Sequence, residues 1–231
     1  MLQAISLSKR YDTHLALDNL DLTVKPGEVF CLLGQNGAGK TTTINLFLGF
    51  LEPTSGKIKI NGTEISGQNQ DRRKYLAYIP EVVMLYGQLT ALENLDYFSK
   101  LAGFEYTTQQ LRNFLNKCGL QEEAHQQKLS GFSKGMRQKV GIAIALAKNA
   151  QVILMDEPTS GLDPKASDEF TALVKQLAAD GKSILMATHD IFNAVHVGTH
   201  IGIMKKGKLI HTLKADEISA NDLQKLYLQT I

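Results

Sequence analysis

This sequence has few cysteines, no tryptophan and almost no net charge. Its 231 residues include two cysteines and no tryptophan, and 25 basic residues against 23 acidic ones leave a net charge of +2. Cys31 lies in an apolar run typical of a buried strand, so a disulfide with Cys118 is not expected and a reducing compartment is favoured. Since no block of like charge occurs, nothing indicates a nucleic-acid surface.

Long apolar runs are also missing. The longest uninterrupted apolar stretch, glycine included, is Val140–Ala147, far short of the ~18 to 20 residues that span a bilayer. The segment Met1–Tyr11 lacks the continuous apolar core of a secretory signal. A role at a membrane would therefore need another chain to supply the span. The length fits one α/β domain, with or without an inserted subdomain.

The apolar pattern predicts strands in the first third of the chain. Alternation over Leu2–Leu7 and Leu20–Val24 indicates antiparallel strands. The fully apolar run Val29–Leu33 enters a glycine-rich loop, as a buried parallel strand would. Further strands in this part are predicted at Lys57–Ile60, Thr63–Ile65 and Tyr75–Pro80.

Helical spacing replaces the strand pattern from Thr90 to Ala147. Apolar residues recur there at intervals of three and four, for example Leu92, Leu95 and Phe98. We therefore expect a helical insertion in this interval. Beyond it the sequence predicts strands at Val152–Met155 and Ser183–Thr188, a helix at Ala166–Ala179, an edge hairpin at Ile201–Met204 and Lys208–Thr212, and a short helix within Lys214–Ile231.

A glycine-rich motif follows the apolar run Val29–Leu33. The segment from Gly34 to Thr41 fits the pattern G-x-x-x-x-G-K-[ST] at every fixed position. Its glycines let backbone N–H groups converge on phosphate oxygens, and a helix that begins near Lys40 adds its positive dipole end. Lys40 would bridge the β and γ phosphates, and the Thr41 hydroxyl would ligate magnesium. The predicted ATP-binding residues here are Gly34, Gln35, Asn36, Gly37, Ala38, Gly39, Lys40, Thr41 and Thr42.

Two acidic residues end the strand predicted at Val152–Met155. Asp156 would hold the magnesium through a water, and Glu157 would polarise the attacking water as general base. A pair of acids after a strand is also what a helix N-terminus favours. The phosphate loop earlier in the chain favours the catalytic interpretation.

Together these motifs resemble those of the nucleotide-binding subunits of ABC transporters, from about Leu2 to His211. The stretch Asp156-Glu157-Pro158-Thr159-Ser160-Gly161-Leu162-Asp163 is similar to that family's joined Walker B motif and D-loop, and Thr188-His189-Asp190 to its switch histidine. The resemblance implies that His189 contacts the γ-phosphate. It also implies an α/β fold: a P-loop NTPase (RecA-like) core with an antiparallel β subdomain and an inserted α-helical subdomain.

The same resemblance suggests how a single ABC ATPase domain would be divided. The ATP-binding core would occupy residues about 1–81 and 150–213, the helical subdomain about 82–149, and a short C-terminal helix about 214–231. That last helix would either contact a partner or pack on the domain.

The family's signature, Leu-Ser-Gly-Gly-Gln, has two overlapping candidates. Leu129-Ser130-Gly131 matches its first three letters. The segment Phe132–Met136 stands at the usual distance before the Walker B aspartate, and we assign the signature to this segment.

The assigned signature keeps part of the family pattern and departs from the rest. Ser133 and Gly135 retain the hydroxyl and the N–H group that the family directs at the γ-phosphate of the partner subunit's ATP. Lys134 and Met136 replace other letters. A lysine there either adds a charge contact to the phosphates or points to solvent, and both readings stay open.

Two further positions take their roles from the resemblance. Tyr11 stands where the family places an aromatic ring against adenine, a contact worth only ~1 to 3 kcal/mol, and a plain strand-end residue is the alternative that stays open. Glu81 stands where the family has a glutamine that senses magnesium, and a carboxylate binds that metal more strongly than an amide does. The predicted metal-binding residues are thus Thr41, Asp156 and Glu81.

The resemblance also implies a function and its partners. The chain would bind ATP and Mg²⁺, hydrolyse ATP with Lys40, Glu157 and His189, and dimerise head to tail with an identical or a related subunit. It would drive an integral membrane permease from the cytoplasmic face of the cell membrane, without nucleic acid. The letters of Tyr78–Glu81 and of the signature are similar to the bacterial branch that pairs with ABC-2-type export permeases, which favours export.

Alternatives stay open at two points. A soluble ABC-type ATPase acting on nucleic acid or ribosomes usually carries tandem ATPase domains or a long coiled-coil insertion, and this chain has neither. The apolar stretch Val82–Tyr86, with Leu89 and Phe98, stands where the family forms a groove for the permease, and it would serve equally as the core of the helical subdomain. The cargo would be selected by the permease, so this sequence does not identify it.

Overall fold

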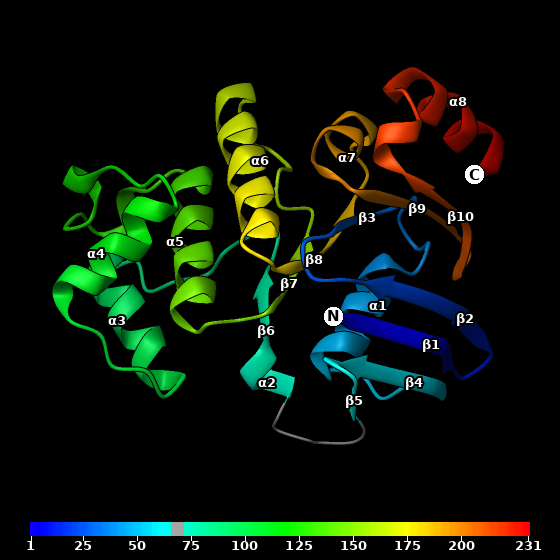
Figure 1. Ribbon diagram of the computed structural model, residues 1–231, viewed down its shortest axis with the longest axis horizontal. Helices are drawn as coiled ribbons and strands as arrows, with labels where there is room; N and C mark the ends of the chain where they lie inside the picture. Colours follow the sequence, from blue (N-terminus) through cyan, green and yellow to red (C-terminus); the bar gives the residue numbers. More distant parts are fainter. Residues whose placement is uncertain (66–71) are drawn as a thin grey trace.

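The computed structural model describes residues 1–65 and 72–231, arranged as two sheets with helices around them (Figure 1). The strands are β1 (Leu2–Tyr11), β2 (His14–Val24), β3 (Val29–Leu33), β4 (Ser55–Ile60), β5 (Thr63–Ile65), β6 (Leu76–Ile79), β7 (Val152–Asp156), β8 (Ser183–Thr188), β9 (His200–Lys205) and β10 (Lys208–Lys214). The α-helices are α1 (Lys40–Leu48), α2 (Arg72–Tyr75), α3 (Ala91–Leu101), α4 (Thr108–Lys117), α5 (Lys134–Ala147), α6 (Pro164–Ala179), α7 (Ile191–Val197) and α8 (Ala220–Thr230). Three short 3₁₀ helices are η1 (Glu122–Ala124), η2 (Leu129–Gly131) and η3 (Ala215–Glu217).

The two sheets differ in strand direction. A four-stranded antiparallel sheet has the order β2-β1-β4-β5. A six-stranded sheet has the order β10-β9-β3-β8-β7-β6, in which β9, β3, β8, β7 and β6 are parallel and β10 closes one edge antiparallel. The carboxyl ends of β3, β7 and β8 therefore meet at one edge of the parallel sheet, where ligands bind in open α/β sheets.

Alternate residues of the parallel strands enter two different cores. Cys31 in β3 and Ile153 in β7 face a core that includes residues of α6 and α7, and the neighbouring Leu32 and Leu154 face a second core shared with α1 and the antiparallel sheet. Helix α1 is thus enclosed between the two sheets (Figure 1). Because both faces are covered, these strands read as continuous apolar runs.

The helices α3, α4 and α5 form a group beside the parallel sheet, drawn in green in Figure 1. Thr90 and Thr107 begin the first two of these helices with capping boxes, in which the threonine hydroxyl and the side chain three residues later satisfy each other's backbone N–H groups. Buried apolar residues such as Leu95, Leu115 and Val140 join the group to the larger core. At the C-terminus, Leu223 of α8 is fully buried in the same core.

Several element boundaries differ from the sequence prediction. The strand predicted to begin at Tyr75 begins at Leu76, because the parallel ladder with β7 starts at the pair Leu76–Val152, and Tyr75 ends α2. The strand predicted to end at Leu7 continues to Tyr11. Register shifts interrupt its pairing with β2 after Ala4, so the apolar alternation breaks although the strand does not.

Other expectations agree with the structure more closely. Both cysteines are free and buried, and burial raises the pKa of each thiol to about 12. The C-terminal segment predicted to contain a short helix contains η3 and α8. Within residues 1–65 and 72–231, no helix combines the length and apolar character that crossing a membrane requires.

Candidate active site

The glycine-rich loop lies between the end of β3 and the start of α1, with Gly34 and Gly39 in confined places. A side chain at Gly34 would meet the Met204 carbonyl oxygen at 2.8 Å, and one at Gly39 would meet the Ala16 carbonyl oxygen at 2.9 Å. Gly39 caps α1 with a φ of 109°, a conformation that L side chains rarely adopt. The loop therefore keeps its shape through close backbone approach that only glycine permits.

A cavity of about 420 Å³ opens over this loop. Its lining includes the predicted loop residues other than Gly34 and Ala38, and also Tyr11, which lies at the end of β1 with its side chain partly exposed. The ammonium group of Lys9 lies 5.2 Å from the centre of the Tyr11 ring. The full lining consists of Tyr11, His14, Ala16, Gln35, Asn36, Gly37, Gly39, Lys40, Thr41 and Thr42.

Two of the lining residues, His14 and Ala16, were not predicted. They lie at the start of β2, which returns directly from Tyr11 past the loop. A hairpin between Tyr11 and His14 would have indicated them, but the sequence prediction began this strand only at Leu20.

Lys40 is buried and bends back toward the loop. Its Nζ donates to the Gly34 carbonyl oxygen at 2.5 Å and lies 3.9 Å from Oε1 of Glu157. Burial lowers the pKa of Lys40, while the carboxylates of Glu157 and Asp156 act in the opposite direction. The lysine thus lies between the loop backbone and both predicted acids.

Thr41 and Asp156 meet across the edge of the sheet. The Thr41 hydroxyl donates to Oδ2 of Asp156 at 3.2 Å. Burial is the main cause that raises the pKa of Asp156; Glu157 and Glu81 raise it further, and the Thr41 hydrogen bond and Lys40 oppose the rise. A hydroxyl and a carboxylate oxygen at this separation are hard oxygen donors suited to Mg²⁺, which proteins hold through few carboxylates.

Glu157 is held in an unusual backbone conformation beside His189. Its φ is +45°, and its N–H donates to the Ala187 carbonyl oxygen at 2.9 Å. Its Oε2 lies 2.8 Å from His189 Nδ1 and accepts from the His189 backbone N–H at 3.3 Å. Left-handed φ values at non-glycine residues cost free energy and concentrate at functional sites. The strain directs the carboxylate toward the space between Lys40 and His189.

The predicted signature begins helix α5. Ser133 is the N-cap residue, and its hydroxyl oxygen accepts from the Met136 backbone N–H at 3.3 Å. The competing segment Leu129–Gly131 forms the 3₁₀ helix η2 and does not start the long helix. The N–H groups of the first turn of α5 therefore belong to the segment that we assigned as the signature.

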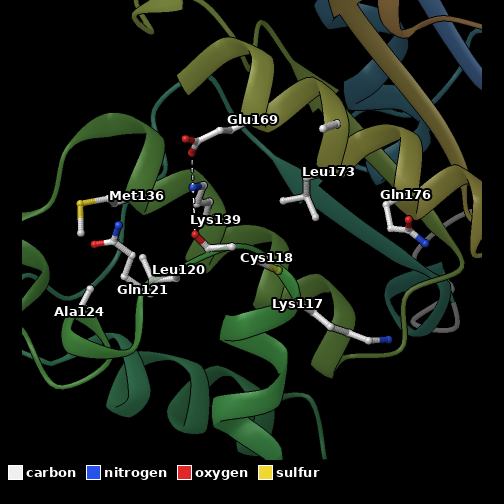
Figure 2. Close-up of a pocket in the computed structure, with 12 residues that line it drawn as sticks. Lys117, Cys118, Leu120, Gln121, Ala124, Met136, Lys139, Glu169, Leu173 and Gln176 are labelled. Carbon is white, nitrogen blue, oxygen red and sulfur yellow. Dashed lines mark hydrogen bonds and ion pairs between the residues drawn. The ribbon is translucent and has the colours of Figure 1, made fainter. Parts of the chain in front are cut away.

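Two polar contacts fix α5 on the core of the protein. The buried Gln138 side chain donates to the Pro158 carbonyl oxygen, just after Glu157. Figure 2 shows Lys139 reaching from α5 to Glu169 on α6, with Nζ 2.6 Å from Oε2. This pair lies at a cavity of about 550 Å³ whose lining includes Met136. Sequence reasoning had attached no role to Gln138.

The structure brings Glu81 closest to Lys134 and Ser160. Oε1 of Glu81 accepts from the Ser160 hydroxyl at 2.9 Å and lies 3.8 Å from Lys134 Nζ. The predicted ligand Glu81 therefore contacts the signature helix and the loop after β7, whereas Thr41 and Asp156 contact each other.

The stretch Val82–Tyr86 divides between two environments. Val83 is buried and lies close to Gly141 of α5, while Val82, Met84 and Tyr86 are exposed. The core interpretation therefore holds for Val83, and the exposed residues leave the groove for the permease as a prediction.

Comparisons with known proteins agree with this geometry. Residues 17–160 match the family model described as ABC transporter. The bacitracin transport ATP-binding protein BcrA of Bacillus licheniformis is 35% identical over 231 residues, covering 99% of this chain and 74% of that protein. The Nod factor export ATP-binding protein I of Cupriavidus metallidurans is 33% identical over 225 residues, covering 96% of this chain and 74% of that protein.

A solved structure supports the same conclusion. The dimeric structure of a post-hydrolysis state of an ATP-binding cassette, bound to ADP and Pi, is 30% identical with a TM-score of 0.80, and the match covers 93% of this chain and 99% of that one. The predicted α/β P-loop fold is thereby confirmed. The chain belongs to the ABC transporter family, as an ATP-binding subunit that hydrolyses ATP.

Proposed function

We propose that this chain is the motor subunit of an export system, and that it hydrolyses ATP at the cavity over the phosphate loop after dimerising. The observation that carries the proposal is the position of Glu157, whose carboxylate lies 3.9 Å from Lys40 and 2.8 Å from His189. A base, a cation and a second polar group thus converge at the carboxyl edge of the sheet. This arrangement suits attack of a water on a γ-phosphate.

Each residue then has a role in binding or hydrolysis. The N–H groups of Gly34 to Thr41 and the N-terminus of α1 bind the phosphates, and Lys40 leaves the Gly34 carbonyl for the β and γ oxygens. Glu157 accepts the proton of the attacking water. His189 is both anchored by Glu157 and largely exposed, so it is free to contact the γ-phosphate.

Thr41 and Asp156 would hold Mg²⁺, and Glu81, whose charge raises the pKa of Asp156, is proposed as a further ligand. When bound, the ion neutralises the charge that develops on the phosphate oxygens. The residues fit because the Thr41 hydroxyl and the Asp156 carboxylate already face each other. The half-buried Asp156 carboxylate, whose pKa is raised, would be stabilised in its charged form by a neighbouring cation.

The other half of each site comes from the partner subunit in this proposal. Ser133 and Gly135 present a hydroxyl and an N–H group at the start of α5, and Tyr11 stacks on the adenine of its own subunit's ATP. The partner is either a second copy of this chain or a related ATP-binding subunit. The dimeric assembly of the solved cassette supports this arrangement.

The permease partner would bind beside α3 and α5. A mainly apolar cavity of about 840 Å³ lies there, lined by Phe98, Leu101, Phe104, Ile144 and neighbouring residues. Leu101 is 71% exposed, and Tyr86 and Tyr97 pack edge-to-face nearby, with ring centres 5.2 Å apart. Exposed apolar groups around such a cavity mark a protein interaction site.

Within this proposal the chain acts as one ABC ATPase domain at the cytoplasmic face of the cell membrane, without nucleic acid. Its core is about 1–81 and 150–213, its helical subdomain about 82–149 and its C-terminal helix about 214–231. Export is supported by the relative named for Nod factor export and by the similarity to the ABC-2-type branch.

The experiment measures phosphate release by the purified chain with ATP and Mg²⁺, and then co-purification with a polytopic membrane protein encoded beside its gene. We expect Leu101→Glu to abolish co-purification. The matched control is Leu228→Glu, which changes a similarly exposed leucine on α8 and should leave co-purification intact. Equal binding by both variants would contradict the proposed docking site.

A further inference from the structure

Two of this chain's departures from the family motifs involve charge, and the structure places them together. Glu81 stands in place of a neutral glutamine and Lys134 in place of a neutral glycine. Lys134 Nζ lies 3.8 Å from Oε1 of Glu81. One added negative charge thus lies beside one added positive charge.

Ser160, in the loop after β7, connects the two. Its carbonyl oxygen accepts from Lys134 Nζ at 2.5 Å, and its hydroxyl donates to Oε1 of Glu81 at 2.9 Å. The first residue of α5 is thereby held to the loop after β6 and to the loop after β7 within one subunit.

We propose that Lys134 exchanges partners during the ATPase cycle. In the monomer it pairs with Glu81, and in the dimer it moves to the γ-phosphate of the ATP bound by the partner subunit. This inference rests on the proposed head-to-tail dimer. It makes Lys134 a phosphate-binding residue and Glu81 a positioning residue that acts through Lys134.

Exposure and charge favour such an exchange. The Lys134 side chain is 30% exposed and that of Glu81 52%, and ion pairs of this kind stabilise a protein only slightly. A γ-phosphate offers several charged oxygens to the same ammonium group, and charge-assisted hydrogen bonds to phosphate are stronger than a contact at 3.8 Å. Lys134 follows the capping Ser133, so it lies next to the N–H groups expected to face the phosphate.

The exchange has a consequence for dimerisation. Because Glu81 competes with the partner's ATP for Lys134, neutralising Glu81 should favour the dimer. Glu81→Gln suits this test, because the amide oxygen still accepts the Ser160 hydroxyl and only the charge is lost.

The experiment is a double-mutant cycle in a Glu157→Gln parent, which prevents turnover. The fraction of dimer is measured by sedimentation over a titration of ATP with Mg²⁺, so the readout does not depend on activity. We expect Glu81→Gln to lower the ATP concentration at half-dimerisation about 2- to 5-fold, the range for a partly exposed ion pair. Lys134→Met should raise that concentration, and adding Glu81→Gln to Lys134→Met should change nothing further.

The cycle separates this effect from a role of Glu81 at its own magnesium. An effect through the metal would persist in the Lys134→Met background, whereas an effect through Lys134 disappears there. Raising the salt concentration should shrink the Glu81→Gln shift, since the pair is partly exposed.

Glu169→Gln provides the matched control. It removes a 2.6 Å ion pair between α5 and α6, at Lys139, and should leave dimerisation unchanged. Equal shifts by Glu81→Gln in both backgrounds, or no shift with Lys134 present, would overturn the exchange. A Glu157→Gln parent that stays monomeric at every ATP concentration would instead overturn the proposed dimer, and the exchange with it.

Discussion

The phosphate loop and the signature segment differ in how many of their contacts this chain itself supplies. Around the loop, Lys40 is buried, Gly34 and Gly39 are confined by neighbouring backbone, and the acids Asp156 and Glu157 lie against it. At the signature, Ser133 is exposed and its hydroxyl caps α5. The difference is what the proposed dimer requires, in which one subunit suffices to bind ATP and two are needed to hydrolyse it.

The largest effect should come from Glu157→Gln on the loop side. An amide cannot accept the proton of the attacking water, so the rate of hydrolysis should fall by about 10² to 10⁴-fold. ATP binding should persist, because the loop and Lys40 are unchanged. Single-turnover phosphate release and ATP binding to the same preparation would measure both; loss of binding as well would mean that Glu157 shapes the loop.

Gly39→Ala should weaken the loop itself. The new methyl group would meet the Ala16 carbonyl oxygen at 2.9 Å, and the φ of 109° would be strained. Such strain costs about 1 to 3 kcal/mol, which corresponds to roughly 5- to 150-fold weaker ATP binding if binding requires the present loop shape. Gly37→Ala, in the same loop, where φ is also positive and no atom lies within 4 Å, controls for backbone strain alone. Equal losses in the two variants would show that crowding against Ala16 is unimportant.

Ser133→Asp should affect hydrolysis while sparing ATP binding by the monomer. Aspartate caps helices as well as serine does, so α5 should keep its stability, but a negative charge would then face the partner's phosphate. Ser133→Ala supplies the converse control, since it loses the cap at a cost of about 0.5 to 2 kcal/mol and adds no charge. Measurements of thermal unfolding and of ATP hydrolysis distinguish the two variants. A Ser133→Asp variant with normal hydrolysis would contradict the assigned signature.

The smallest effect should be a gain in stability from Asp156→Asn without nucleotide. The native pKa of Asp156 is raised, so the native state holds its proton to higher pH than the unfolded state, and stability falls as pH rises from the ordinary value of 3.8 through the native value. The variant lacks this penalty while keeping an acceptor for the Thr41 hydroxyl. It should resist urea better than the parent near neutral pH, with a difference that shrinks on acidification. A stability difference between variant and parent that grows on acidification would contradict a raised pKa for Asp156.

The sequence predicted the chemistry of the site better than its surroundings. Phosphate and metal binding require particular residue types at fixed spacing, so two motifs were recognisable in the sequence: the segment Gly34–Thr41 and the pair Asp156-Glu157. His14 and Ala16 escaped prediction because the bulges in β1 and β2 break the apolar alternation that marks a strand.

Tertiary contacts were the least predictable part. The pairing of Glu81 with Lys134 joins residues 53 positions apart on a loop and a helix that no local pattern relates. The left-handed φ of Glu157 likewise depends on its hydrogen bond to Ala187 in the neighbouring strand. The fold class followed from the family resemblance that the phosphate loop and the acidic pair carry, so it was predictable before these contacts were known.

Mixing two inactive variants tests most directly whether the site is divided between subunits. Lys40→Met should disable the phosphate loop and leave the signature intact, and Ser133→Asp should do the reverse. Neither variant alone should hydrolyse ATP, but mixed dimers contain one site with an intact loop and an intact signature. ATP hydrolysis by the mixture should therefore exceed the sum of the two separate preparations. A mixture that only equals that sum would contradict a site shared between subunits.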